Sequence, residues 1–275
     1  SSPSYSHRYY VDASPTVVDA FFDSSWHTVL ISGLGAGGQG YFALDITDPA
    51  AFSNETEAAK KVLWEFTDKN DPDMGYTMGD ANIVRLNNGK WAALFSSGYN
   101  NTFDNDIDGT ANNASNDSED GNGYIYIVDL QTGSLISKFD TQTGRNEDPT
   151  QQSRPNGIAT PTAIDVNQDG TTDLIYAGDM FGNVWSIEIS SSNKNDWDFT
   201  YKDPDTSKPL PLYSACFGTS CSEDNIQPIT TPLKVEKHKT EDGYLILFGT
   251  GKYFEVGDNT PNNQVTQSFY AIWDP

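Results

Sequence analysis

The stretch Pro161-Thr-Ala-Ile-Asp-Val-Asn-Gln-Asp-Gly-Thr-Thr-Asp-Leu-Ile-Tyr-Ala-Gly-Asp-Met-Phe-Gly-Asn-Val-Trp-Ser-Ile-Glu-Ile189 contains the structural unit that repeats along the chain. A short apolar strand follows the proline, a polar turn comes next, a second strand ends at Gly178, and a third runs to Ile189. Runs of β-branched and aromatic residues bounded by Gly, Asn and Asp are typical of strands. Three such strands joined by turns predict a small antiparallel sheet.

The unit recurs four times, and its first strand opens at Pro15, Ala81, Pro161 and Pro232. Repeated small sheets predict an all-β fold, a modified β-propeller with at least four antiparallel blades near residues 10–66, 79–140, 158–201 and 228–274. The units are longer than the roughly 40 to 50 residues of common propeller repeats, so long inserted loops are expected. Residues 1–275 then form a single propeller domain or part of a larger propeller. A β-sandwich is the competing architecture, but it does not require the same glycine before each third strand.

Composition limits the function further. The 275 residues carry 39 acidic and 16 basic side chains, a net charge of -23. Nucleic acid is excluded as a partner, because proteins that bind it need clustered cations against the phosphates. The apolar run at residues 244–248 is far too short to cross a bilayer, so no transmembrane segment is expected. A helix is expected only at residues 48–61. The chain begins without a leader, which indicates processing or a longer parent protein.

The clearest chemical signal lies in the polar turn of the quoted stretch. Oxygen-bearing side chains occupy alternate positions of residues 165–173, and Gly170 stands at the sixth position, where a calcium loop turns sharply. Calcium takes six to eight oxygen ligands at about 2.4 Å, and carboxylates crowded in one turn repel each other unless a cation lies among them. The predicted ligands are Asp165, Asn167, Asp169, Thr171 and Asp173, with Ca²⁺ as the cofactor. The flanks read as strands, so the loop is not an EF-hand.

A second acidic stretch begins with Asp104, Asp106 and Asp108. Its first half follows the same alternation, but Asn112 stands at the ninth position, where the first loop has an acid. A solvated insertion therefore remains the simpler interpretation, and a second ion remains the alternative.

Two further motifs are interpreted as structural. Gly33-Leu34-Gly35-Ala36-Gly37-Gly38 matches a dinucleotide-binding pattern, but a strand follows it where that fold needs a helix, so a glycine bend is predicted. Cys216 and Cys221 enclose Phe-Gly-Thr-Ser, which can bend back to form a disulfide; a pair of free thiols is the alternative. A disulfide would indicate an oxidising compartment.

Several short motifs together resemble the C-terminal propeller domain of the type IV pilus tip adhesins, the PilY and PilC family. They lie at residues 10–16, 26–30, 33–45, 64–66, 89–91, 97–101, 165–173, 182–185 and 249–254. The resemblance covers nearly the whole chain. Each motif alone is weak, but the set is specific.

The resemblance implies a calcium-binding adhesin and assembly factor, without catalysis, at the extracellular pilus tip on the bacterial outer surface, reached through the periplasm. It implies support of pilus extension against retraction, twitching motility, and attachment to host or abiotic surfaces. The implied partners are minor pilins, a surface receptor and other segments or an N-terminal domain of the same protein. Two alternatives remain. One is a quinoprotein-type propeller enzyme, although such enzymes use adjacent cysteines; the other is a carbohydrate-binding propeller.

Overall fold

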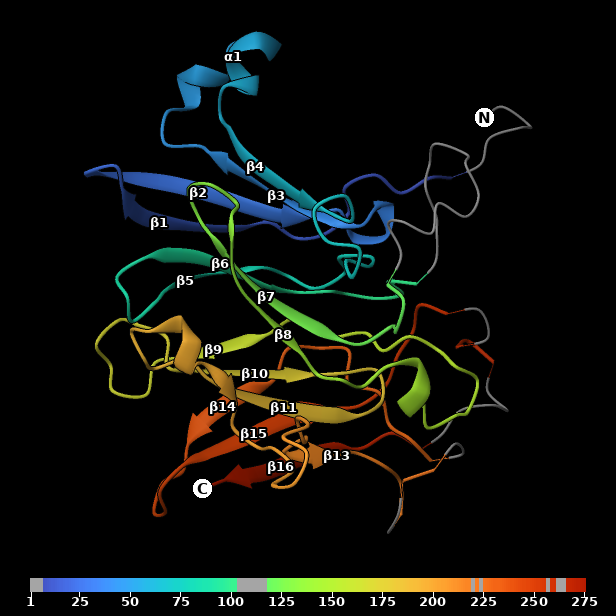
Figure 1. Ribbon diagram of the computed structural model, residues 1–275. Helices are drawn as coiled ribbons and strands as arrows, with labels where there is room; N and C mark the ends of the chain where they lie inside the picture. Colours follow the sequence, from blue (N-terminus) through green and yellow to red (C-terminus); the bar gives the residue numbers. More distant parts are fainter. Residues whose placement is uncertain (1–6, 103–117, 219–220, 223–224, 256–257, 261–265) are drawn as a thin grey trace.

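The computed structural model describes residues 7–102, 118–218, 221–222, 225–255, 258–260 and 266–275. The described chain forms four antiparallel sheets, which confirms the predicted all-β fold (Figure 1). The first sheet contains β1 (Thr16–Phe22), β2 (Ser25–Gly33), β3 (Gly40–Asp45) and β4 (Val62–Thr67). The second contains β5 (Asn82–Arg85), β6 (Trp91–Ser96), β7 (Tyr124–Asp129) and β8 (Leu135–Asp140). We call these sheets blades 1 and 2.

Blade 3 contains β9 (Thr162–Ile164), β10 (Leu174–Gly178), β11 (Asn183–Glu188) and two short strands, β12 (Asp198–Phe199) and β13 (Tyr213–Ser214), which both pair with β11. Blade 4 contains β14 (Lys234–Lys237), β15 (Tyr244–Gly249) and β16 (Phe269–Asp274). In every blade the strands follow one another in chain order, as in a meander, except that β13 of blade 3 returns to pair with β11. The two-residue strands β12 and β13 are too short for any periodicity to reveal in the sequence.

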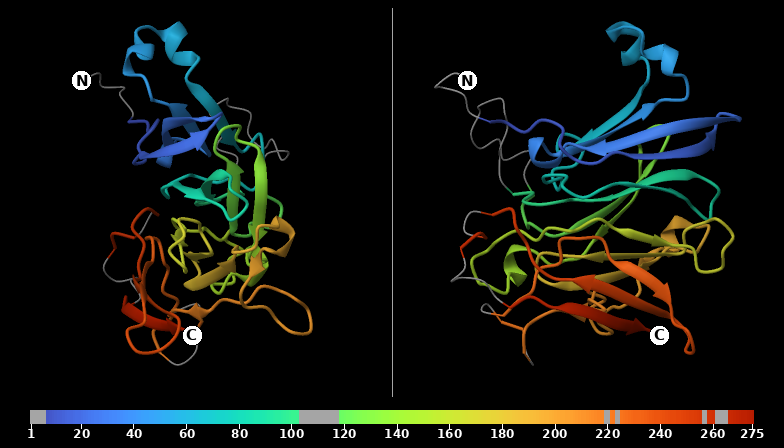
Figure 2. Two further views of the ribbon diagram at one scale, coloured as in Figure 1. Left: turned by 90° about the vertical axis from the view of Figure 1, so that its left-hand side faces the viewer. Right: turned by 180° about the vertical axis from the view of Figure 1, so that it is seen from behind.

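The blades stack in chain order, from blade 1 in blue to blade 4 in red (Figures 1 and 2). Their first strands lie nearest one another, because β1 contacts β5, β5 contacts β9, and β9 contacts β14. Sheets that meet through their first strands and extend away from a common side have the arrangement of propeller blades.

Side-chain alternation in the middle blades explains this stacking. In blade 2, Phe95 and Tyr126 pack against blade 1, whereas Leu94 and Ile127 face blade 3. Because successive strand residues point to opposite faces, a sheet buried on both sides must be apolar at nearly every position. The sequences of β6 (Trp91–Ser96) and β7 (Tyr124–Asp129) are apolar in this continuous way, and three apolar clusters fill the three spaces between the four blades.

The outer faces of blades 1 and 4 remain open among the described residues. On blade 4, Phe269 is 72% exposed and Trp273 is 49% exposed, while Ile246 and Phe248 face inward to blade 3. On blade 1, Val17 and Phe21 are about half exposed. Large exposed apolar faces of this kind are uncommon on isolated domains.

The remaining elements are short. Residues expected to favour a helix form a 3₁₀ turn, η2 (Pro49–Phe52), and one turn of helix, α1 (Glu55–Ala59), whose Asn54 side chain accepts a hydrogen bond from the Glu57 amide. The Gly-rich motif forms the predicted bend, η1 (Gly35–Gly37), between two strands of blade 1. No helix in the described chain is long and apolar enough to cross a membrane.

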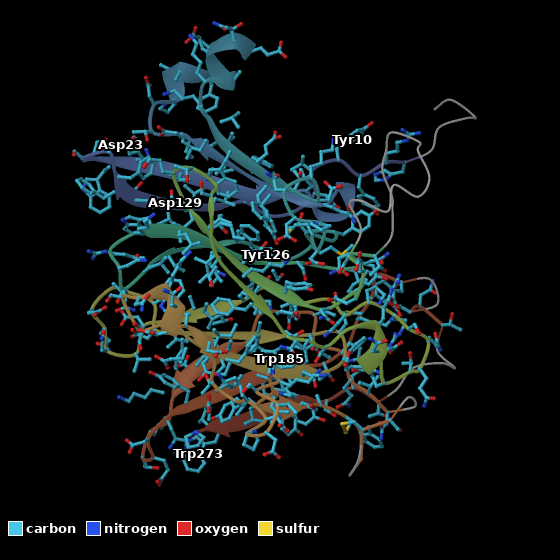
Figure 3. The ribbon with its side chains drawn as sticks, viewed as in Figure 1. Tyr10, Asp23, Tyr126, Asp129, Trp185 and Trp273 are labelled. Atoms are coloured by element: carbon cyan, nitrogen blue, oxygen red, sulfur yellow. A yellow bond between two sulfur atoms is a disulfide. The ribbon has the colours of Figure 1, made fainter. Side chains whose placement is uncertain are left out.

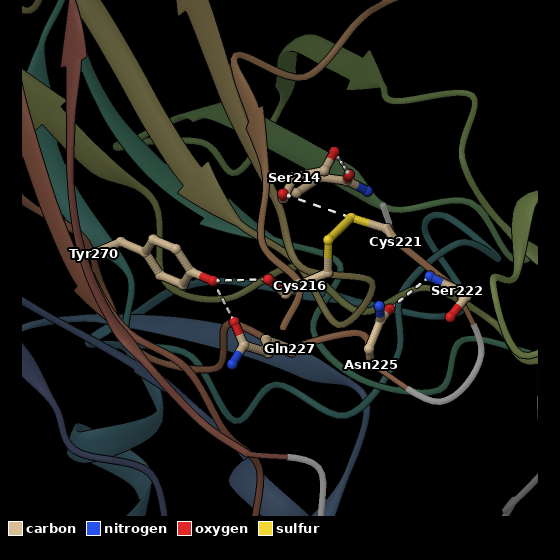
Figure 4. The surroundings of a disulfide bond; sticks show 8 residues. Ser214, Cys216, Cys221, Ser222, Asn225, Gln227 and Tyr270 are labelled. Carbon is tan, nitrogen blue, oxygen red and sulfur yellow. Dashed lines mark hydrogen bonds between the residues drawn. A yellow bond between two sulfur atoms is a disulfide. The ribbon is translucent and has the colours of Figure 1, made fainter. Parts of the chain in front are cut away.

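The predicted disulfide joins Cys216 to Cys221 and closes a loop beside blade 4 (Figure 4). The Tyr270 hydroxyl of β16 donates to the Cys216 carbonyl at 3.1 Å and also bonds the Gln227 side chain. The loop is therefore anchored to the last strand of the described sheet through its first cysteine.

Candidate metal site

The predicted calcium loop, residues 165–173, connects β9 to β10, the first two strands of blade 3. The loop thus joins two neighbouring strands of one blade, near the side where the first strands of the blades meet. Gly170 adopts a φ of +86° and Gln168 a φ of +62°, both left-handed conformations that reverse the chain within the loop.

The Asp165 carboxylate organises the start of the loop. Its Oδ1 atom accepts hydrogen bonds from the amides of Gln168 at 2.6 Å and Asp169 at 3.2 Å, and its Oδ2 atom accepts one from the Gly170 amide at 2.8 Å. A carboxylate that caps successive amides closes the turn around itself. One lone pair of Oδ2 remains for a cation, because each carboxylate oxygen can accept two partners.

Asp169 lies at the exposed tip of the loop. Its Oδ1 atom accepts from the Thr171 amide at 2.8 Å and from the Thr171 hydroxyl, and its Oδ2 atom accepts from Asn167 Nδ2 at 3.1 Å. The hydrogen bonds from Thr171 lower the pKa of the Asp169 carboxyl, so this side chain is ionised at neutral pH.

Asp173 is different, because it is only 4% exposed. Its Oδ2 atom accepts from the Val166 amide at 2.8 Å, which closes the loop across its two ends. Its Oδ1 atom accepts from Asn87 Nδ2 at 3.1 Å, and Asn87 belongs to the β5–β6 turn of blade 2. The ninth-position acid is therefore fixed by a residue of the neighbouring blade.

Asn87 makes two further bonds to the loop. Its Nδ2 atom donates to the Thr172 carbonyl at 2.9 Å, and its Oδ1 atom accepts from the Thr171 hydroxyl at 3.0 Å. The Thr172 amide also donates to the Arg85 carbonyl at 2.8 Å. Sequence reasoning missed Asn87, because nothing in a turn 80 or so residues upstream marks it as a neighbour of the loop. The loop is thus an element of contact between blades 2 and 3.

The donor chemistry of the loop fits a hard divalent cation. Five side chains bearing oxygen lie within nine residues, three of them carboxylates. Within the part of the chain that the structure describes, no group of three or more His, Cys, Asp or Glu side chains converges in a way that could hold a metal ion. Amide, hydroxyl and carbonyl oxygens would therefore have to complete the ligand set, as they do in calcium loops.

The second acidic stretch, with Asp104, Asp106 and Asp108, lies outside the described residues.

His27 of blade 1 belongs to a hydrogen-bonded array of side chains near the surface. His27 Nδ1 is 3.0 Å from Asp45 Oδ2, and His27 Nε2 is 2.9 Å from the Ser25 hydroxyl. This order of groups matches that of a hydrolytic triad, but the His27 ring stacks on Phe22 with centroids 4.0 Å apart at the tip of an open hairpin. We therefore interpret the array as structural.

The stacked antiparallel meanders of the described chain are those of a β-propeller fold. A family model described as the PilY1 beta-propeller domain matches residues 3–275. The chain belongs to this PilY1 propeller family, and the family resemblance inferred from sequence is confirmed.

Two relatives are more than one-third identical to this chain over the aligned region. It is 39% identical over 276 residues to a type IV pilus biogenesis factor PilY1 homolog of Xylella fastidiosa, covering 100% of this chain and 17% of that protein. It is 36% identical over 284 residues to the type IV pilus biogenesis factor PilY1 of Pseudomonas aeruginosa (strain UCBPP-PA14), covering 98% of this chain and 21% of that protein. The chain thus spans about a fifth of these relatives' length.

A solved structure supports the same assignment. The crystal structure of the Pseudomonas aeruginosa PilY1 C-terminal domain matches with a TM-score of 0.73 and 36% identity, covering 96% of this chain and 49% of that chain. The relatives are named as biogenesis factors, which agrees with the prediction that the chain is not an enzyme and favours it over the quinoprotein alternative.

Proposed function

We propose that this chain is the calcium-binding propeller portion of a type IV pilus biogenesis factor. The observation that carries the proposal is the identity of 36 to 39% over nearly the whole chain with proteins named for that role. The polar loop at residues 165–173 supports the calcium part, because its residue types and spacing are those of an oxygen-ligand site.

Calcium binding would act through charge and through the contact between blades. A divalent cation neutralises the mutual repulsion of Asp165, Asp169 and Asp173. It also stabilises the conformation of the β9–β10 turn in which Asn87 forms hydrogen bonds to the loop. A ligand that favours one arrangement of two packed elements shifts the population toward that arrangement. Binding would thereby stabilise one orientation of blade 3 against blade 2 and alter a partner-binding surface.

The proposed setting is the pilus tip on the outer surface of a bacterium, reached through the periplasm. There the protein contacts minor pilins and a host or abiotic surface receptor, supports pilus extension against retraction, and so promotes twitching motility and attachment. The disulfide between Cys216 and Cys221 supports an oxidising location of this kind.

Further segments of the same protein are proposed to cover the outer faces of blades 1 and 4. The exposed side chains of Phe269 and Trp273 support this, as does the span of the match, since the chain covers 49% of the solved PilY1 domain. Apolar faces of sheets are stable when another element covers them.

The test is a twitching assay in a strain that carries Asp169→Ala in the intact protein. We expect motility to fall with the loss of the calcium ligand. The matched control is Asp203→Ala, which removes a carboxylate from another exposed turn, where Asp203 accepts hydrogen bonds from Asp205 and Thr206 amides at 3.0 and 2.8 Å. Equal motility of the two variants would refute the calcium role, provided that both are present on the surface at wild-type levels.

A further inference from the structure

An open cleft of about 670 Å³ lies at the end of blade 1, away from the calcium loop. It is lined by Arg8, Tyr9 and Tyr10 of the segment before β1, by the end of β4 and the turn that follows it, and by the glycine bend η1 with Gln39. Figure 3 labels Tyr10 at this end of the sheet. Volumes of roughly 300 to 1,000 Å³ are usual for small-ligand sites.

The glycines of the bend η1 allow the segment with Tyr10 to pack closely against the bend. A Cβ atom on Gly37 would lie 1.9 Å from the Tyr10 carbonyl oxygen, and one on Gly35 would lie 2.1 Å from Asp12 Oδ1. Asp12 Oδ1 in turn accepts a hydrogen bond from the Ala36 amide at 2.8 Å. The Gly-rich motif therefore positions the segment that carries the tyrosines, a role separate from that of a phosphate loop.

Exposed tyrosine rings and charged side chains line the cleft. Tyr9 is 56% exposed and Tyr10 is 72% exposed, although buried aromatic rings dominate elsewhere in the chain. Arg8 and Lys69 line the cleft together with the acids Glu65 and Asp68, and in the described part of the chain neither cation makes an ion pair. The cleft thus holds as many cations as acids, whereas the whole chain has 16 basic and 39 acidic side chains, so the cleft is less acidic than the chain as a whole.

We propose that this cleft binds a short saccharide that carries a carboxylate. A sugar ring has one face of C–H groups, which packs on an exposed tyrosine ring, and a rim of hydroxyls that bond planar polar groups such as those of Gln39 and Glu65. A sugar carboxylate would pair with Arg8 or Lys69, since charge-assisted bonds of this kind are the strong ones. This inference rests on the proposed adhesive function, because it identifies the class of ligand that the protein would bind during surface attachment.

The test uses the intact protein with calcium and a panel of immobilised oligosaccharides, half of them containing uronic or sialic acids and half neutral. The acidic members are expected to bind, with affinity then measured by calorimetry on the strongest one. Tyr10→Ala should weaken binding about tenfold or more, whereas Tyr10→Phe, which keeps the ring, should bind within about threefold of wild type. The paired change Arg8→Gln with Lys69→Gln should remove the preference for acidic over neutral members.

Tyr253→Ala is the matched control, because Tyr253 is 76% exposed in a different loop. It should leave affinity unchanged. The proposal is overturned if no acidic member binds, if only neutral members bind, or if Tyr10→Ala binds as well as Tyr253→Ala. Asp169→Ala separates this inference from the calcium proposal, since it should lose the calcium response and keep saccharide binding.

Discussion

Asp148 shows how single residues hold the long loop between β8 and β9. Its side chain is fully buried against Arg154, with Arg154 Nη2 3.1 Å from Oδ1, and it also accepts from the Arg154 amide at 2.9 Å and the Thr150 amide at 3.0 Å. Burial alone would raise the pKa of this carboxyl, but the bonds from Arg154 and Thr150 outweigh it and hold the pKa below its usual value.

Asp148→Asn should therefore destabilise the protein in a pH-dependent way. A carboxyl with a depressed native pKa stabilises the fold above its unfolded pKa of about 3.9, and that contribution disappears as pH falls through the native pKa. We expect a loss of about 1 to 3 kcal/mol in the free energy of unfolding at pH 7, shrinking toward zero below pH 4. Denaturant titrations across this pH range provide the measurement.

The control for Asp148 is Asp198→Asn. Asp198 pairs with Lys202 on the surface, with both side chains at least a third exposed, so its loss should cost less than about 1 kcal/mol. If the two variants lose stability equally, or if the Asp148→Asn effect does not change with pH, the buried ion pair is not the stabilising feature.

At the scale of elements, the turn between β5 and β6 contacts the predicted calcium loop of the next blade. Asn87 orients Asp173 and Thr171, and residues that orient metal ligands typically contribute tenfold to a hundredfold to affinity. Asn87→Ala should therefore weaken calcium binding at least tenfold by calorimetry. Asn88→Ala is the control, because the bond that Asn88 Oδ1 accepts within the described chain comes from the Lys90 amide at 3.1 Å and not from the loop. Unchanged affinity in Asn87→Ala would show that the blades do not cooperate at the site.

The elements that could be predicted from sequence are those with strong local signals. β10 (Leu174–Gly178) follows from an unbroken apolar run ended by glycine, β11 (Asn183–Glu188) from the apolar residues that come after Gly182, and the bend η1 from its glycines. The contribution of Asn87 could not be predicted, because it depends on how blade 2 packs against blade 3. The cleft at Tyr10 was missed for the same reason, since its walls come from segments before β1 and after β4.

At the scale of the whole molecule, the outer face of blade 4 is unusual because it exposes large apolar side chains. Phe269, Ala271 and Trp273 alternate outward along β16, while Tyr270 and Ile272 pack against the core cluster shared with blade 3. A strand with apolar residues on both faces indicates that another sheet covers the second face.

Phe269→Asp in the intact protein tests whether this face is covered. A charge placed in a covered apolar face should cost about 2 kcal/mol or more in the free energy of unfolding, because it is desolvated without a partner. Tyr253→Asp, at a loop position that is 76% exposed, should change stability by no more than about 0.5 kcal/mol. Equal, small effects of both changes would mean that the outer face of blade 4 is open to water.

The most direct test of calcium binding by the loop is a crystal structure of the intact protein grown with calcium. The account predicts anomalous density for one ion at the β9–β10 turn, with carboxylate and other oxygens of residues 165–173 at about 2.4 Å and the Asn87 contacts kept. An unliganded turn at saturating calcium, or an ion held elsewhere, would contradict it.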